Sequence, residues 1–271
     1  MVYPTGAPLA YKVDHVGVSI AGAQDAFEFC RDELRLPVAW PFARYGSAST
    51  GGIGLGNLNL EWLEMGTVSL CVREPSAVGL IALQRAPESV DALTSALRDR
   101  AIDHGPPMTT GDEVFGFTNV LLADTGFDIA FFCGYHYPGA HDNVLRLASL
   151  DANGGGALRL RGVTELRAAL DLSRWAPILG GGTDTGWRFD TGPSLVIDAA
   201  VTPGIAVMSW SVHDIGSAAE ALRGSGASES EGGFSIPALG GLRISITEGP
   251  VQRPSGLAER RRLGFGPSRS G

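Results

Sequence analysis

Apolar residues in this chain fall into short alternating runs that come in pairs joined by a turn. Each turn places Gly, Asn or Asp where a β-hairpin needs a positive φ angle or a side chain that bonds its own backbone. The pairs occupy residues 52–63, 119–132, 186–199 and 234–247. The pattern therefore predicts four hairpins.

A further strand and a short amphipathic helix precede each hairpin. The strands are predicted at residues 13–20, 79–83, 163–170 and 205–212. After each strand, apolar residues recur every three or four positions, which is the spacing of one helix face. These stretches span residues 23–34, 90–101, 172–179 and 215–222. The chain is therefore predicted to contain four copies of one strand-helix-strands unit, and the pattern weakens toward the C-terminus.

A polar, Gly-rich stretch separates the four units into two pairs. We expect a first pair with the pocket at residues 1–137, a linker at 138–157, a second and degenerate pair at 158–249, and a flexible Arg-containing tail at 250–271. With 271 residues, of which 44% are hydrophobic, the chain is long enough to form two cores.

The formal net charge of -8 argues against a nucleic-acid partner, because no positive field covers the molecule. No apolar run reaches the roughly 20 residues that a transmembrane helix needs, and the N-terminus lacks the pattern of a signal peptide. We therefore expect no membrane partner and a cytoplasmic location. Cys30, Cys71 and Cys133 are widely spaced among apolar neighbours, which is typical of reduced core thiols.

Three sequence stretches carry a resemblance to a known family. They are DHVGV at residues 14–18, GGIGLGNLNLEWLEM at 51–65 and TGFDIAFFCGYH at 125–136. In order and spacing they resemble the vicinal oxygen chelate superfamily, which includes glyoxalase I, bleomycin-resistance proteins and extradiol dioxygenases. The match is good over residues 11–135 and worn over 158–249. The resemblance implies an α+β fold of four βαβββ modules in two pairs, with curved mixed sheets that enclose a cavity.

The resemblance also implies metal ligands on the first and last strands of a module, which correspond here to His15 and Glu61. Strand alternation independently places His15, Gly17 and Ser19 on one face. Imidazole and carboxylate are suitable ligands for a divalent zinc, nickel, manganese or iron ion. We therefore expect His15 and Glu61 to be catalytic residues, metal ligands or both.

Other positions depart from the family pattern. The second module aligns with Gly79 and Ala130, and neither residue can bind a metal through its side chain. In the second pair the corresponding positions are Glu165, Val207 and Ser245, which form no convincing site. A catalytic metal normally needs about three protein ligands. Candidates for a third ligand are Asp128, His136 and His141; alternatively, His15 and Glu61 form a hydrogen-bonded or acid/base pair without metal.

Two functions follow from these residues. The first is a lyase, isomerase or dioxygenase that acts on a small oxygen-rich substrate at the His15 and Glu61 site. The second is a binding or drug-sequestering protein with a mainly apolar pocket. A structural role in assembly, as in a homodimer, is a third and weaker hypothesis. The candidate substrate-binding residues are Ser19, Trp40, Phe42, Tyr45, Trp62, Phe115, Phe117 and Asp128.

Overall fold

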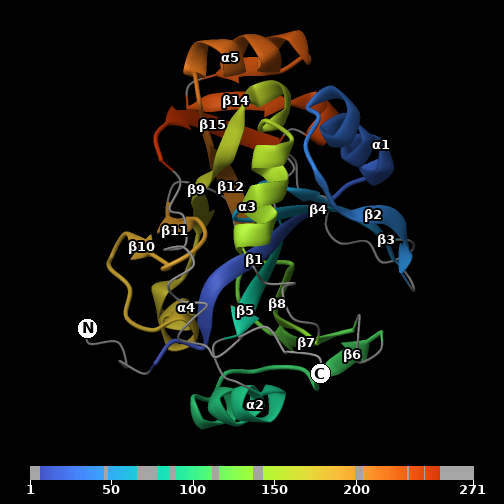
Figure 1. Ribbon diagram of the computed structural model, residues 1–271. Helices are drawn as coiled ribbons and strands as arrows, with labels where there is room; N and C mark the ends of the chain where they lie inside the picture. Colours follow the sequence, from blue (N-terminus) through green and yellow to red (C-terminus); the bar gives the residue numbers. More distant parts are fainter. Residues whose placement is uncertain are drawn as a thin grey trace, which may run out of the picture.

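The computed structural model describes residues 7–45, 48–65, 79–85, 89–111, 116–136, 143–198, 204–230, 232–240 and 242–250. Two mixed β-sheets with associated helices make up the molecule, which confirms the predicted α+β fold class (Figure 1). Three residues considered in the sequence, Cys71, Phe115 and His141, lie outside the described residues. So does the predicted tail beyond residue 250.

The first sheet contains the first two modules, whose opening strands lie side by side at its centre. Strand β1 is parallel to β4 of its own module and antiparallel to β5, which is in turn parallel to β8. In order across the sheet the strands are β2 (Val38–Tyr45), β3 (Ala48–Gly54), β4 (Asn59–Met65), β1 (Ala10–Ser19), β5 (Leu80–Arg85), β8 (Ile129–Tyr135), β7 (Phe117–Leu122) and β6 (Met108–Thr110).

The second sheet repeats this plan with the last two modules. Strand β9 is antiparallel to β12, and each is parallel to the last strand of its own module, β11 and β15. Within the described residues the third module has two strands after its helix, where the other modules have three. The strand order is β10 (Gly186–Trp187), β11 (Ser194–Ile197), β9 (Leu160–Ala169), β12 (Gly204–Val212), β15 (Leu242–Glu248), β14 (Gly233–Ile236) and β13 (Ser228–Ser230).

A helix follows the first strand of each module, as the apolar spacing predicts. These helices are α1 (Ala23–Glu28), which continues as a π-helical turn (Phe29–Glu33), α2 (Val90–Asp99), α4 (Leu172–Leu179) and α5 (Ile215–Gly224). Side-chain caps fix several starts: the Ser89 hydroxyl accepts from the Ala92 amide before α2, and the Asp214 carboxylate accepts from the Ser217 amide at the start of α5. No helix of the described chain has the length and apolarity to cross a membrane.

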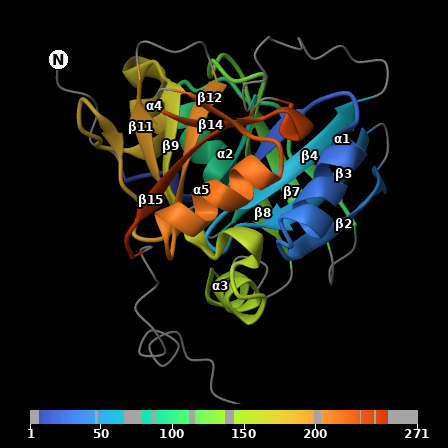
Figure 2. The same cartoon turned by 90° about the horizontal axis from the view of Figure 1, so that it is seen from above.

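The segment between the two pairs contains a helix that the sequence pattern did not identify. Helix α3 (Asn143–Ala152) is followed by a 3-10 turn (Gly156–Leu158), and a second 3-10 turn lies at Pro237–Leu239. Leu147 and Leu150 of α3 are buried. Figures 1 and 2 show α3 standing beside the two sheets as a separate element. The described part of the predicted linker, residues 143–157, thus contributes a packed helix and most of a 3-10 turn.

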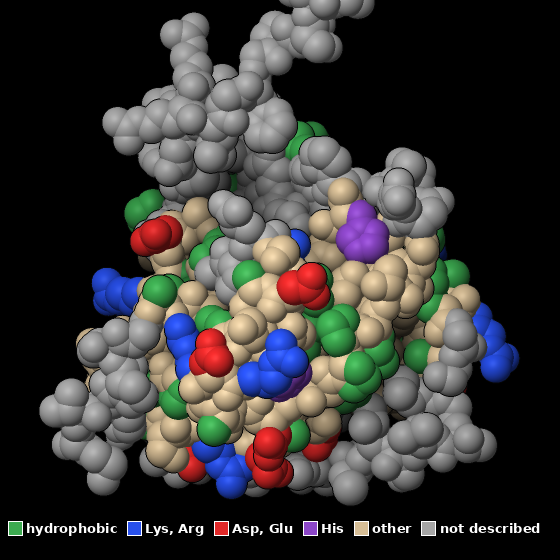
Figure 3. All heavy atoms as spheres, turned by 90° about the horizontal axis from the view of Figure 1, so that it is seen from below, with side chains coloured by type: hydrophobic (Ala, Val, Ile, Leu, Met, Phe, Trp, Pro, Cys, Tyr) green, Lys and Arg blue, Asp and Glu red, His purple; other side chains and the backbone are tan. Residues whose placement is uncertain are grey.

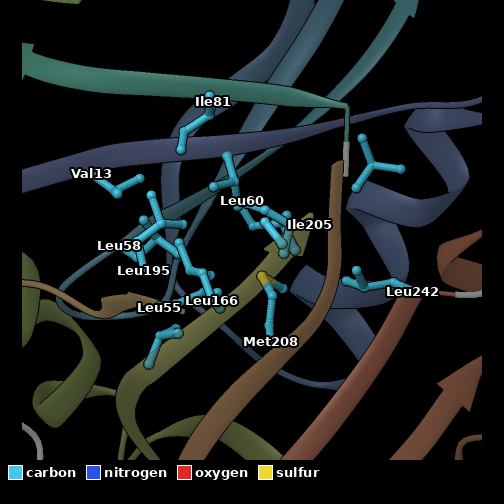
Figure 4. Close-up of a cluster of buried hydrophobic side chains, with 14 of the residues drawn as sticks. Val13, Leu55, Leu58, Leu60, Ile81, Leu166, Leu195, Ile205, Met208 and Leu242 are labelled. Atoms are coloured by element: carbon cyan, nitrogen blue, oxygen red, sulfur yellow. The ribbon is translucent and has the colours of Figure 1, made fainter. Parts of the chain in front are cut away.

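The hydrophobic core lies between the two sheets (Figure 4). Val13, Leu60 and Ile81 of the first sheet meet Leu166 and Met208 of the second in one buried cluster. This arrangement buries one face of each sheet and provides most of the favourable free energy of folding.

A buried amide joins the two halves beside this core. The side chain of Asn57, in the turn between β3 and β4, donates to the Val163 carbonyl at 2.7 Å and accepts from the Val163 amide at 2.8 Å. The turn of the first sheet is therefore paired with a strand of the second.

Charged side chains of both signs are spread over the surface. On the face viewed from below, Lys and Arg side chains are interspersed with Asp and Glu (Figure 3). The described residues of that face therefore produce no broad field of one sign.

Candidate functional site

A cavity of about 510 Å³ lies against the first sheet, on the face opposite the core. Alternation along the strands separates the two faces: Leu60 and Trp62 of β4 are in the core, whereas Asn59 and Glu61 line the cavity. The principal polar lining residues are His15, Thr50, Asn59, Glu61, Tyr135 and Arg146. The principal apolar and aromatic ones are Val38, Trp40, Tyr45, Phe117, Phe131 and Leu145.

A β-bulge in β1 brings Asp14 to the same side as His15. Val13 pairs with Leu83 of β5 and His15 pairs with Ala82, so Asp14 has no partner residue on that strand. The extra residue bends the strand and re-aims its side chain. As a result, a carboxylate oxygen of Asp14 lies 2.9 Å from Nδ1 of His15.

Asp14 is a fully buried carboxylate that accepts two further side-chain hydrogen bonds. The Tyr135 hydroxyl donates to it at 2.9 Å, and Arg146 of α3 donates to its other oxygen at 3.0 Å. Burial alone would raise the pKa of Asp14, but the charge of Arg146 and the hydrogen bond from His15 outweigh it and hold that pKa well below its usual value. The carboxylate is therefore ionised and can only accept hydrogen bonds.

The same network sets the states of its other members. Burial, reinforced by the charge of Asp14, raises the pKa of the Tyr135 phenol well above its usual value, so this hydroxyl keeps its proton. Burial tends to lower the pKa of Arg146, but the adjacent Asp14 carboxylate raises it overall. Burial also raises the pKa of the Cys133 thiol in the cavity wall, which makes it a poor nucleophile.

Glu61 faces His15 across the cavity floor. The Thr50 hydroxyl of β3 donates to one oxygen of Glu61 at 2.6 Å, and the other oxygen lies 3.5 Å from Nε2 of His15. Because Nδ1 of His15 donates to Asp14, Nε2 carries the lone pair of the neutral imidazole. Nε2 of His15 and one oxygen of Glu61 thus face each other. The other ring nitrogen of His15 is bonded to Asp14, and the other oxygen of Glu61 accepts from Thr50.

Two adjacent glycines in β3 allow large rings to pack on both faces of the strand. A Cβ added at Gly52 would lie 2.4 Å from the ring of Trp40, and one added at Gly51 would lie 2.8 Å from Phe27 and 2.9 Å from Phe42. Trp40 therefore lies flat on the cavity face, where its ring makes an edge contact with His15 at a centroid distance of 5.8 Å. Phe42 packs on the opposite face against Phe27.

The structure separates the predicted substrate-binding residues into groups. Trp40, Tyr45 and Phe117 line the cavity. Trp62 and Phe42 lie on the core side. Strand alternation points Trp62 away from the face that carries Glu61, whereas for Phe42 an irregularity in the pairing of β2 after Trp40 breaks the alternation. The cavity lining also does not include Ser19, near the end of β1, or Asp128, whose carboxylate lies against Gly79.

The residues of the second module that face the site are not Gly79 and Ala130, the two positions that the sequence resemblance indicated. Gly79 precedes β5, and Ala130 points into the core. Because His15 pairs with Ala82, and Ala82 with Phe131, the residues that face the site are Ala82 and Phe131. Neither can bind a metal through its side chain. Within the described ranges, no group of three or more His, Cys, Asp or Glu is placed to hold a metal ion.

Two of the other described histidines, His104 and His136, have local hydrogen-bond partners. His136 lies 2.9 Å from the Thr118 hydroxyl, and Nδ1 of His104 lies 2.9 Å from the Ile102 carbonyl. His213 is exposed before α5. In the second sheet Glu165 forms an ion pair with Arg167 at 2.6 Å. None of these residues lines the cavity.

Sequence reasoning missed Asp14, Thr50, Tyr135 and Arg146 as site residues. For Tyr135 a signal was present, since Phe131, Cys133 and Tyr135 alternate along one strand face. For Arg146 the signal was the apolar spacing of Leu147 and Leu150, which marks a helix inside the supposed linker. Asp14 and Thr50 gave no such signal.

Comparison with known proteins identifies the fold. No protein-family model matches the chain, and no curated protein sequence matches it. Among solved structures, homoprotocatechuate 2,3-dioxygenase from Arthrobacter globiformis superposes with a TM-score of 0.56 at 15% identity, covering 91% of this chain and 83% of that one. The Mn(II)-bound glyoxalase from Novosphingobium aromaticivorans gives 0.55 at 12% identity, covering 92% and 91%.

A third similar structure is the 2,3-dioxygenase from Pseudomonas sp. KL28, with a TM-score of 0.55 at 9% identity, covering 90% of this chain and 94% of that one. These likenesses extend over nearly the whole chain, but the identities are low. What they establish is therefore the arrangement of the elements. The chain has the glyoxalase-like α+β fold that these structures share.

Proposed function

We propose that this protein is a small-molecule enzyme of the lyase or isomerase type, in which His15 and Glu61 transfer a proton of a substrate bound in the cavity. The observation that carries this proposal is the approach of His15 Nε2 to a Glu61 oxygen at 3.5 Å, with Asp14 bonded behind the imidazole. A histidine oriented by a buried carboxylate is a recurring general base.

In the proposed reaction each residue has a distinct part in proton transfer. Nε2 of His15 accepts a proton from the carbon next to a substrate carbonyl, or from a hydroxyl. Asp14 keeps Nδ1 as the donor and stabilises the imidazolium that forms. Glu61, fixed by Thr50, stabilises the same charge from the other side and accepts or returns a proton at the neighbouring substrate atom. His15 and Glu61 are both buried, which limits the access of water to the reacting atoms.

A divalent zinc, nickel, manganese or iron ion would use His15 and Glu61 as ligands. Imidazole nitrogen and carboxylate oxygen are suitable donors. The described residues provide no third ligand, because Ala82 and Phe131 occupy the facing positions. The donor set among these residues is thus incomplete for a catalytic metal, and we derive no step through one. This incompleteness favours the lyase or isomerase type over the dioxygenase type.

Exchange of a carbon-bound proton with solvent tests the proposal. 2-Hydroxyacetophenone, an uncharged aromatic hydroxyketone, is incubated with the protein in heavy water, and loss of its methylene signal is followed by proton NMR. We expect exchange above the buffer rate, and a drop of about a hundredfold or more in His15→Gln. Glu61→Gln should also slow exchange.

Glu64→Gln is the matched control, because Glu64 lies on the same strand but is exposed. It should exchange at the wild-type rate. Exchange no faster than in buffer, or equally fast in His15→Gln, would overturn the proposed chemistry.

A second candidate function, binding without chemistry, is favoured by the lining of the cavity. Trp40, Phe117 and Phe131 provide large aromatic surfaces, as expected of a pocket that holds an apolar ligand. Under this reading His15 and Glu61 orient the ligand. Tight binding of an aromatic ligand that never exchanges or changes would support this alternative.

A further inference from the structure

When the imidazole of His15 is neutral, the reactive end of the cavity presents hydrogen-bond acceptors that have no donor among the described residues. Nε2 of His15 and the free oxygen of Glu61 face each other at 3.5 Å, and both are acceptors when the imidazole is neutral. Two acceptors in contact repel each other, so a donor or a positive charge between them is stabilising. The buried side-chain oxygens of Asn59 and Asn119, which also line the cavity, have no partner among the described atoms.

The positive charge in the cavity wall is already paired with a carboxylate of the protein. Arg146 is the one Lys or Arg among the described lining residues, and its side chain is 12% exposed. Its two terminal nitrogens donate to the carboxylate and to the backbone carbonyl of Asp14, at 3.0 and 3.1 Å. Releasing it toward a ligand would leave Asp14 buried and unpaired, which is strongly unfavourable. Because Arg146 and Asp14 neutralise each other, the remaining charge among the described residues of the site is that of Glu61.

The rest of the cavity favours an aromatic body. The ring of His15 makes edge contacts with Trp40 and Phe131, at centroid distances of 5.8 and 5.5 Å. Three exposed lining residues, Val38, Tyr45 and Leu145, add apolar surface. The rings of Trp40 and Phe131 pack well against another aromatic ring, which favours an aromatic ligand.

We propose that the cavity selects an aromatic ligand that is uncharged or cationic and carries a hydrogen-bond donor, and that it discriminates against carboxylates and phosphates. The donor binds between His15 and Glu61, and the ring lies among Trp40, Phe117 and Phe131. This inference rests on the proposed use of the His15 and Glu61 site, and it names the substrate class for that site.

Three ligands that share one frame and differ in charge test the inference. Tyramine, tyrosol and 4-hydroxyphenylacetate have the same phenol and carry a positive, a neutral and a negative side chain at pH 7.5. Their affinities for the chelator-treated full-length protein are measured by isothermal titration calorimetry. We expect tyrosol and tyramine to bind at least about tenfold more tightly than 4-hydroxyphenylacetate, because a second negative charge is placed near Glu61.

Two variants locate the source of the discrimination. Glu61→Gln removes the charge and should bring the three affinities together, whereas the exposed Glu64→Gln should leave their order unchanged. The inference is overturned if 4-hydroxyphenylacetate binds as tightly as tyrosol, or if none of the three binds. It is also overturned if the wild type prefers 4-hydroxyphenylacetate and Arg146→Met loses that preference, because Arg146 would then bind the carboxylate.

These outcomes are separable from the proposed chemistry. The expected order of affinities without any proton exchange would sustain the ligand class and refute catalysis. Proton exchange together with a preference for the carboxylate would support catalysis and refute the proposed ligand class.

Discussion

The guanidinium of Arg146 lies 3.0 Å from the carboxylate of Asp14, which precedes it by 132 positions in the chain. Helix α3 is thereby fixed to the floor of the first sheet. The buried pair holds the residue that orients His15, so the segment between the two halves is part of the candidate site.

Removing Arg146 should destabilise the protein strongly. Arg146→Met leaves Asp14 buried without its cation, which we expect to lower the free energy of unfolding by about 3–5 kcal/mol. The double variant Asp14→Asn with Arg146→Met should lose clearly less than the sum of the two single variants. Urea unfolding at pH 7 measures all four proteins.

The ion pair between Glu165 and Arg167 provides the control for that cycle. The Arg167 side chain is 48% exposed, so Arg167→Met should cost at most about 1 kcal/mol. Equal costs for the two arginine variants would show that the pair at Asp14 is not the buried anchor that its geometry indicates.

Acid should remove the contribution of Asp14. Its folded pKa lies below the ordinary value of about 3.9, so its stabilisation is complete above that value and is lost as pH falls toward the folded pKa. The difference in unfolding free energy between wild type and Asp14→Asn should be constant from pH 7 to 5. It should shrink by about 1 kcal/mol at pH 3. A difference that does not change with pH would contradict this.

A methyl group at Gly52 should disturb the cavity. The Cβ of Gly52→Ala would lie 2.4 Å from the ring of Trp40, which must then move over His15. We expect a loss of roughly 1–3 kcal/mol in stability and weaker binding of tyrosol. Gly181→Ala, where a Cβ meets nothing within 4 Å, should leave tyrosol affinity unchanged. Unchanged affinity in both variants would argue against Trp40 as a binding surface.

Metal analysis tests whether the two visible ligands suffice. Protein purified without chelator or added metal should contain well under one equivalent of zinc, nickel, manganese or iron by mass spectrometry, because two ligands are fewer than a catalytic site normally uses. Near one equivalent, lost in both His15→Ala and Glu61→Ala, would contradict this. Loss in His141→Ala as well would identify a third ligand beyond the described residues.

Much of the fold was predictable because its signals are local. Each of these patterns depends on residues that are close together in the sequence: the hairpin turns, the strand alternation and the helix spacing after each first strand. Strand β2 was not recognised from the pattern, since VAWPFARY mixes polar and aromatic residues on an exposed edge. Helix α3 was hidden because its polar, Gly-rich flanks suggested a linker.

The site was predictable only as far as strand alternation holds. His15 and Glu61 follow that rule. Asp14 breaks it, because a bulge turns a residue that should face the core toward the cavity. Bulges depend on how two strands pair, and one strand alone does not reveal them. Local spacing marks the helix that carries Arg146, but no local pattern indicates that this helix docks beside Asp14.

The amide of Asn57 bonded to both backbone groups of Val163 has a consequence for how this chain can change over time. The repeated units no longer behave as separable copies, because the turn beside the cavity is completed by a strand of the second sheet. Selection for a working cavity therefore also preserves the sheet behind it. The second half thereby acts as a scaffold for the first.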